Sequence, residues 1–292
     1  MSSKIALRLT AVAAVAALVL IACGPEEEPA ADDAAAGSGG QEQECAKEDL
    51  NLVDPGQLTI ATDKPAFEPW FVDNDPSNGE GFESAVAYAV AEEMGFAEDE
   101  VEWVVEPFNK SYAPGPKDYD FDINQISITP ERDEAVDFSD GYYDVNQALI
   151  VPKDSDLAGV TSLADLQDAK LGAQVGTTSF AYIQQYIQPT EEPFTYDTTN
   201  DAKSALRAGQ IDGIVVDLPT AFYITAVEIP NSTVAGQFVS QGEGEQFGLL
   251  FEDGNPLVDC VNQALQTLKD DGTLAEIQDE WLSQAVDAPV IE

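Results

Sequence analysis

The sequence predicts an α/β protein built from two units of alternating strands and helices. Three observations support this fold class. Strands and helices alternate over residues 57–143, and a second alternation occupies residues 147–246. The chain has 292 residues, 44% of them hydrophobic, which is enough for two domains of ordinary size with their own cores. Alternating strands and helices favour a largely parallel sheet in each unit.

The first unit begins with a short strand that ends on an acid, Asp63. A helix then runs from Gly81 to Gly95, where glycine is a typical C-terminal stop. Pro114, Gly115 and Pro116 predict a loop over 108–117. The expected strands of this unit are residues 57–63, 101–105 and 121–128.

The second unit is inserted between residues 147 and 246, because a last strand and two amphipathic helices follow it. Its expected strands are 147–151, 170–175 and 211–216. Its expected helices are 162–166, 202–208 and one that starts at Leu218. The elements after the insertion are a strand at 247–251 and helices at 257–268 and 274–282.

The charge balance excludes several classes of function. The net charge is −43, from 12 Lys+Arg against 55 Asp+Glu, so nucleic acids and anionic lipid surfaces are repelled. Such acidity fits a saline habitat or a highly charged surface. The chain has no His, which removes the usual general base and the commonest metal ligand. We therefore expect no metal and no cofactor.

The first 22 residues read as an export signal. Lys4 and Arg8 precede an apolar run over 10–22 that is too short and too rich in Ala to favour a permanent membrane span. The run ends in Leu-Ile-Ala-Cys-Gly at 20–24, which resembles a bacterial lipobox with Cys23 as the lipidated residue. The alternative is an ordinary signal peptide with an incidental Cys. A lipobox predicts attachment to the cell membrane outside the cytoplasm.

A low-complexity stretch of Pro, Glu, Asp, Ala, Gly and Gln follows at 24–44. It has no aromatic residue and no apolar period, so it predicts a flexible spacer rather than a packed core. We assign residues 23–50 to an acidic tether. An acidic tail that binds a partner is the alternative.

Two further cysteines, Cys45 and Cys260, remain in the folded part of an exported chain. Their even number favours a disulfide between them, because disulfides persist outside the cytoplasm. Two free thiols are the alternative.

A stretch from Asp120 to Tyr143 carries the clearest signal for a binding site. Ser127 lies near the end of its predicted strand, and Arg132 follows Pro130, which starts a helical turn. Open α/β sheets bind ligands at the carboxyl ends of their strands, and a guanidinium suits a carboxylate. The alternative is a solvated Arg132 paired with Glu131 or Asp133.

The second unit offers two matching strand ends. Gly176 and Thr178 follow the strand at 170–175 and resemble a helix N-terminus that binds an anion, although the same residues also make an ordinary helix cap. Asp217 ends the strand at 211–216 and is either a ligand contact or the cap of the helix at Leu218.

Taken in order from Leu58 to Leu282, the folded part resembles the family-3 extracellular solute-binding proteins of ABC importers. The resemblance rests on eight segments, which are Leu-Thr-Ile-Ala-Thr-Asp (58–63), Gly-Phe-Glu (81–83), Ser-Ile-Thr-Pro-Glu-Arg (127–132), Val-Asp-Phe-Ser with Tyr-Tyr (136–139, 142–143), Ser-Leu-Ala-Asp-Leu (162–166), Val-Gly-Thr-Thr (175–178), Val-Val-Asp (215–217) and Asp-Gly-Thr-Leu before Trp281 (271–274).

The resemblance implies a type II periplasmic-binding-protein fold, with two lobes joined by two extended crossings that allow hinge closure. Lobe 1 would comprise residues 51–147 and 247–292, and lobe 2 residues 148–246, with crossings near 148–151 and 246–249. It also implies an amino-acid ligand, an ABC permease as partner, and a monomer.

The same resemblance implies roles for ten residues. Arg132, Ser127 and Thr178 would bind the ligand α-carboxylate, and Asp217 its α-ammonium, helped by the backbone at Gln125. Phe67 and Phe108 would hold the ligand between their rings, with Trp70 on the same wall, although core packing is the alternative for all three. Asp63 and Glu83 indicate a polar or basic ligand side chain, whereas Gln125 indicates one with an amide.

Two other functions remain open at this point. The ligand could be an amino-acid-like zwitterion or a compatible solute such as ectoine, which the acidity of the chain would suit. The same fold also carries dehydratases and occurs beside the catalytic domain of murein lyases. We favour a binding protein, because no catalytic domain follows Trp281 and the cleft acids have ligand roles.

Overall fold

The computed structural model describes residues 45–238, 244–283 and 288–292, which belong to one compact unit. The expected signal segment 1–22, Cys23 and the spacer up to residue 44 lie outside the described residues. Among the described residues, no helix is long and apolar enough to cross a membrane.

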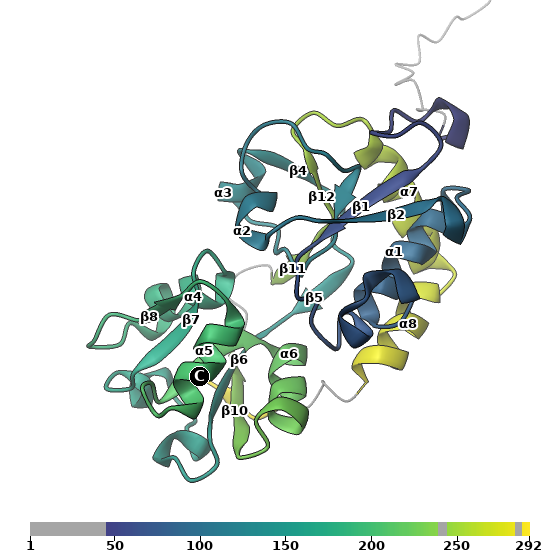
Figure 1. The fold of residues 1–292 in the computed structure, drawn as a ribbon. Coiled ribbons are helices and arrows are strands. Elements are labelled where there is room, and N and C mark those ends of the chain that lie inside the picture. Colours follow the sequence, from purple (N-terminus) through teal and green to yellow (C-terminus); the bar gives the residue numbers. More distant parts are fainter. Residues whose placement is uncertain (1–44, 239–243, 284–287) are drawn as a thin grey trace, which may run out of the picture. The chain divides into compact units, whose positions relative to one another are not determined.

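Lobe 1 is built around a five-stranded sheet in the order β2-β1-β3-β12-β4 (Figure 1). Strand β1 pairs in parallel with β2 and β3, whereas β12 runs antiparallel to β3 and β4. The strands are β1 Leu58–Thr62, β2 Val101–Val105, β3 Phe121–Asp122, β4 Val136–Phe138 and β12 Leu250–Glu252. The helices are α1 Phe82–Glu93, α2 Phe108–Ser111, α3 Pro130–Asp133, α7 Leu257–Asp270 and α8 Thr273–Leu282.

Lobe 2 is built around a six-stranded sheet in the order β13-β10-β6-β9-β7-β8. Strands β7, β8 and β9 are parallel, and β6 runs antiparallel to β9 and β10. The strands are β6 Gln147–Pro152, β7 Leu171–Gln174, β8 Phe194–Tyr196, β9 Gly213–Asp217, β10 Ser232–Phe238 and β13 Val290–Ile291. The helices are α4 Thr178–Tyr182, α5 Thr199–Arg207 and α6 Leu218–Tyr223.

Shorter helical turns connect these elements. They are η1 Lys47–Asp49, η2 Val72–Asn74, η3 Pro76–Asn78, η4 Glu98–Glu100, η5 Asp156–Gly159, η6 Leu163–Leu166, η7 Ile183–Ile187 and η8 Ile224–Glu228.

The first of the two chain crossings differs from its expected position, whereas the second overlaps the expected 246–249. Strands β5 Tyr143–Val145 and β11 Glu245–Phe247 pair antiparallel and belong to neither large sheet. The first crossing therefore precedes the predicted 148–151, because those residues already pair with β9 and β10 inside lobe 2. The end of the chain also departs from its expected place in lobe 1, since β13 pairs with β10 of lobe 2.

Helix α7 explains how the C-terminal part joins lobe 1. Leu257, Val261, Leu265 and Leu268 recur at helical spacing and are buried against the sheet and α1. Cys260 lies on the same helix and is bonded to Cys45, with a Cα–Cα distance of 5.4 Å. The predicted disulfide is confirmed, and it ties the start of the folded part to α7.

The expected strand over 121–128 is shorter than predicted. Strand β3 ends at Asp122, and Gln125 adopts a left-handed conformation with φ of 49°. Its backbone N–H donates to the Glu83 carboxylate, which holds the turn in place. The predicted loop over 108–117 was also incomplete, since Phe108–Ser111 form the single turn α2.

Candidate functional site

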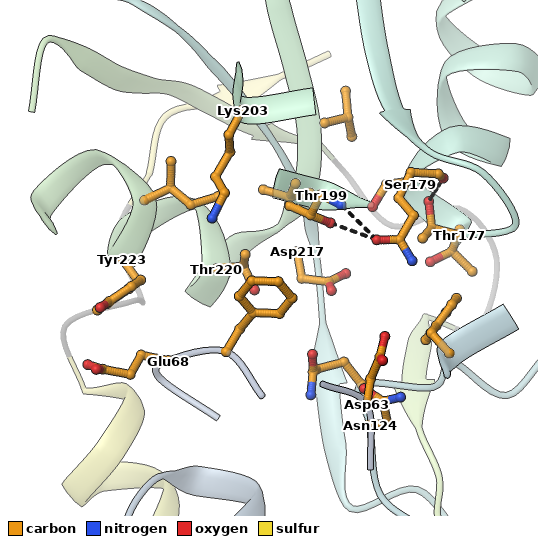
Figure 2. Close-up of a pocket in the computed structure, with 18 of the residues that line it drawn as sticks. Asp63, Glu68, Asn124, Thr177, Ser179, Thr199, Lys203, Asp217, Thr220 and Tyr223 are labelled. Carbon is orange, nitrogen blue, oxygen red and sulfur yellow. Dashed lines mark hydrogen bonds between the residues drawn. The ribbon is translucent and has the colours of Figure 1, made fainter. Parts of the chain in front are cut away.

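A pocket lies between the lobes at the carboxyl ends of their strands (Figure 2). Strand β1 leads into Asp63, strand β9 ends on Asp217, and β7 leads into the turn before α4. Six of the ten predicted ligand contacts line this pocket. They are Asp63, Phe67, Phe108 and Gln125 from lobe 1, and Thr178 and Asp217 from lobe 2.

Asp217 stands at the position that precedes α6, but its side chain makes no capping hydrogen bond. Instead, Gln147 Nε2 donates to Asp217 Oδ1 over 2.8 Å. Burial raises the pKa of the Asp217 carboxyl well above its ordinary value, and the negative charge of Glu245 raises it further. Because its side chain makes no capping hydrogen bond, Asp217 does not cap α6, and its carboxyl group lines the pocket instead.

Asp63 is half-buried on the lobe 1 side of the pocket. Burial raises its pKa, whereas the backbone N–H groups of Lys64 and Phe108 lower it. Lys64 N donates to Asp63 Oδ1 over 2.6 Å. The aromatic rings of Phe67 and Phe108 line the same pocket, so the wall from lobe 1 combines one carboxylate with two apolar faces.

Thr178 begins α4, which Thr177 caps by accepting from Phe180 N. The Thr178 hydroxyl lies 3.3 Å from Ser127 Oγ of lobe 1. Ser127 is buried and donates to Glu245 Oε1 over 2.5 Å. Ser127 therefore lies one contact behind the pocket surface, beside the threonine that lines it.

Arg132 also lies behind the pocket surface. It is 8% exposed, and its guanidinium donates from Nη1 to Ser127 O over 2.7 Å and from Nη2 to Gly176 O over 2.9 Å. The rings of Tyr112 and Phe108 pack over it at 4.8 and 5.5 Å. Burial lowers the Arg132 pKa from its ordinary value. A guanidinium has five N–H donors, and these two bonds use two of them.

Gly176 fits this arrangement because its φ of 79° is left-handed and a side chain there would meet the Tyr112 hydroxyl. The turn before α4 can therefore approach Arg132 closely and offer it a carbonyl oxygen.

Glu83 does not line the pocket, contrary to the expectation that it faces the ligand. It is fully buried at the start of α1 and accepts from Gln125 N over 2.7 Å, from the Tyr142 hydroxyl over 2.5 Å, and from Gln125 Nε2. Burial raises the Glu83 pKa to about 7, and these hydrogen bonds lower it. Glu83 thus positions Gln125, which does line the pocket.

Trp70 is also placed differently from the expectation. Its indole is fully buried in lobe 1 against Phe82, Tyr143 and Phe247, at ring-centre distances of 5.9, 5.8 and 5.6 Å. Core packing, the alternative reading, is correct for this residue. Its Nε1 nevertheless donates to Thr220 Oγ1 of lobe 2 over 2.9 Å.

Sequence reasoning missed several residues of the site. Gln147 and Glu245 flank the crossings and connect Ser127 to Asp217 through hydrogen bonds. Lys203 and Glu228 line the pocket from lobe 2 as an ion pair in which Lys203 is buried and Glu228 is partly exposed. The available signal was the spacing of Thr199 and Lys203, which one helical turn places on the same face.

Among the described residues, no group of three or more Asp, Glu, Cys or His side chains could hold a metal ion. The pocket is instead a mixed surface of hydroxyls, amides, carboxylates and aromatic rings. Such a surface suits a small polar organic molecule.

Two α/β lobes joined by two crossings, with a polar pocket between them, define the type II class of periplasmic binding proteins. Within this class, residues 58–284 match the model of the bacterial extracellular solute-binding proteins, family 3. The chain belongs to that family.

Curated relatives include the ABC transporter arginine-binding protein 1 of Escherichia coli K12, which is 32% identical over 57% of this chain and 67% of its own length. The glutamine-binding protein GlnH of Bacillus subtilis is 29% identical over 72% of this chain and 76% of its own length. The L-cystine-binding protein TcyJ of Escherichia coli K12 is 28% identical over 81% of this chain and 87% of its own length.

Solved structures of amino-acid-binding proteins also match this chain. An ancestral arginine-binding protein bound to arginine matches with a TM-score of 0.64 and 30% identity, covering 78% of this chain and 98% of its own. The ancestral amino acid-binding protein AncCDT-1, a precursor of cyclohexadienyl dehydratase, matches with a TM-score of 0.64 and 30% identity. The match covers 77% of this chain and 95% of that protein. The curated relatives are named as binding proteins, and this chain is a binding protein rather than an enzyme.

Proposed function

We propose that this chain captures a polar or basic α-amino acid and delivers it to an ABC permease. The observation that carries the proposal is the pocket itself. It gathers Asp63, Phe67, Phe108 and Gln125 from one lobe with Thr178 and Asp217 from the other. Relatives named for arginine, glutamine and cystine binding support an amino acid as the ligand.

In this proposal the two charges of a zwitterion are answered from opposite lobes. The Asp217 carboxylate of lobe 2 accepts hydrogen bonds from the α-ammonium. Arg132 of lobe 1 supplies the positive charge for the α-carboxylate from behind the pocket surface, where it donates to the Ser127 carbonyl. The Thr178 hydroxyl, which lies beside Ser127 Oγ, lines the pocket itself. A buried unpaired charge costs several kcal/mol, so a ligand with both charges favours the state in which both lobes contact it.

Isothermal titration of the purified protein with each of the common α-amino acids tests the proposal. We expect heat for one or a few polar or basic amino acids. The absence of heat for every α-amino acid would overturn it, and a response to ectoine alone would replace the amino acid by a compatible solute.

We further propose that lipidated Cys23 anchors the protein outside the cytoplasm, with residues 23–44 as a spacer. The lipobox-like sequence at 20–24 motivates this. The expected tether was 23–50, but residues 45–50 belong to the folded part through the Cys45–Cys260 bond and η1. Expressed in a bacterium, the full chain is expected in the membrane fraction, and the Cys23→Ser variant in the soluble extracytoplasmic fraction. An unchanged distribution of the variant would contradict the anchor.

A further inference from the structure

Lys203 lies in the wall of the pocket (Figure 2). It forms an ion pair there with Glu228. Lys203 comes from α5 and is 2% exposed, and Glu228 is the last residue of η8. Nζ donates to Oε1 over 2.6 Å and to Oε2 over 2.7 Å. Arg207 Nη2 donates to the Glu228 backbone carbonyl over 2.9 Å and so holds the acid in place.

Lys203 also contacts the opposite lobe. Its Nζ lies 5.1 Å from the centre of the Phe67 ring, which belongs to lobe 1 and lines the pocket. The ammonium is therefore enclosed between an aromatic face and a carboxylate. Among the described residues that line the pocket, Lys203 is the sole Lys or Arg, and Glu228 neutralises it.

The remaining hydrogen-bonding capacity of the pair has a definite chemical complement. An ammonium has three donors, and two of them bind Glu228. A carboxylate has about four lone-pair sites, and two of them are used by Lys203. The pair can thus offer one N–H donor next to free acceptor sites. A carboxamide or ureido group presents one carbonyl acceptor next to N–H donors, which is the matching pattern.

A charged ligand side chain fits this wall less well. A guanidinium that took Glu228 would leave the Lys203 ammonium buried without its partner, which is strongly unfavourable. A carboxylate that took Lys203 would leave the Glu228 carboxylate, whose side chain is 25% exposed, without its counter-charge. A neutral amide can bind both partners without separating them.

We propose that the Lys203–Glu228 pair is the specificity determinant that makes this pocket select an α-amino acid with a neutral, amide-like side chain over its charged counterparts. The inference rests on the proposed function, because it concerns the ligand of the same pocket. It narrows that ligand class from polar or basic amino acids to those that end in a carboxamide or ureido group.

Paired ligands that differ in charge but hardly in shape provide the test. Citrulline is the neutral counterpart of arginine, and glutamine is the neutral counterpart of glutamate. Titration calorimetry of the wild-type protein is expected to favour the neutral member of each pair by about tenfold, equivalent to about 1.4 kcal/mol.

Two variants should move these ratios in opposite directions. Lys203→Met leaves the Glu228 carboxylate without its partner, so the ratio of arginine to citrulline affinity should rise by about tenfold. Glu228→Gln leaves the Lys203 ammonium without its partner, so the ratio of glutamate to glutamine affinity should rise by a similar factor. Thermal unfolding shows whether each variant folds. If one does not, the other alone still tests whether the pair sets the preference for neutral side chains.

The Lys47–Glu100 pair supplies a matched control, because it lies outside the pocket and its side chains are 25% and 38% exposed. Lys47→Met should leave both ratios unchanged. Wild-type preference for the charged ligands, or ratios unchanged in both pocket variants, overturns the inference while leaving amino-acid binding intact. If the wild-type protein binds no α-amino acid, the proposed function fails and the inference fails with it.

Discussion

Glu83 and Asp217 are two carboxylates that the sequence assigned to the same ligand, and the structure gives them different surroundings. Glu83 is fully buried, whereas Asp217 is partly exposed. Glu83 has three donors from Gln125 and Tyr142 around it. Asp217 accepts a hydrogen bond from Gln147 and has a neighbouring acid, Glu245. Burial raises the pKa of both groups. A raised pKa alone therefore does not separate a ligand contact from a structural acid, whereas the supply of donors does.

We infer from this comparison that a carboxylate with spare acceptor sites facing the pocket is a candidate contact for a ligand cation. The Glu83 carboxylate accepts from Gln125 N and so fixes the left-handed turn at Gln125. Asp217 keeps acceptor sites toward the pocket, where an α-ammonium would satisfy them. The same substitution, carboxylate to amide, should therefore have different consequences at the two positions.

The largest effect is expected from Asp217→Asn. The variant keeps the shape and the acceptor that Gln147 uses, but it removes the charge that answers the α-ammonium. We expect a loss of affinity of about 3 kcal/mol, or about a hundredfold, measured by calorimetry with whichever amino acid the wild-type protein binds. Stability should stay level or rise, because the charge repulsion from Glu245 is removed.

Glu83→Gln is the matched control for that experiment. Its affinity for the same amino acid should stay within about threefold of the wild-type value, which corresponds to less than about 1 kcal/mol. A hundredfold loss in Glu83→Gln, or none in Asp217→Asn, would mean that the roles of the two acids are reversed.

Sequence reasoning correctly predicted the strands that end at or just before Asp63 and Asp217 and the helix α7, because these depend on local patterns. Strand ends at Asp63 and Asp217 follow from apolar runs that stop at an acid, and α7 follows from its apolar period. The family resemblance then predicted that the residues at these strand ends contact the same ligand. The cysteine count added the Cys45–Cys260 bond.

What the sequence did not predict depends on contacts between distant segments. Glu83 and Gln125 are 42 positions apart, and their contact both buries the acid and ends the strand early. Trp70 looked like a pocket aromatic because nothing local distinguishes it from Phe67, yet it packs in the lobe 1 core. Lys203 sits in an ordinary amphipathic helix, and its burial depends on Glu228, 25 positions away.

A smaller effect is expected on the pH dependence of stability. Protonation of Glu83 should contribute measurably to the free energy of unfolding. Its pKa is about 7 in the folded protein against an ordinary value of 4.5, so the folded state binds more protons than the unfolded state between these values. The contribution of this group to stability is full below about pH 4.5 and is lost as the pH rises through about 7. The free energy of unfolding should therefore fall by about 2 kcal/mol from this group between pH about 5 and about 8.

Denaturant unfolding of the wild-type protein and of Glu83→Gln across this pH range measures that share directly. The variant cannot titrate at position 83, so its stability profile should be flatter by the same amount, with other buried acids such as Asp122 supplying the slope that remains. Asp217→Asn should flatten the profile as well, because its pKa is raised in the same direction. The two variants are thus alike in their pH profiles and differ in affinity. Parallel profiles for Glu83→Gln and the wild-type protein would show that Glu83 is ionised throughout, held by its three donors against the cost of burial.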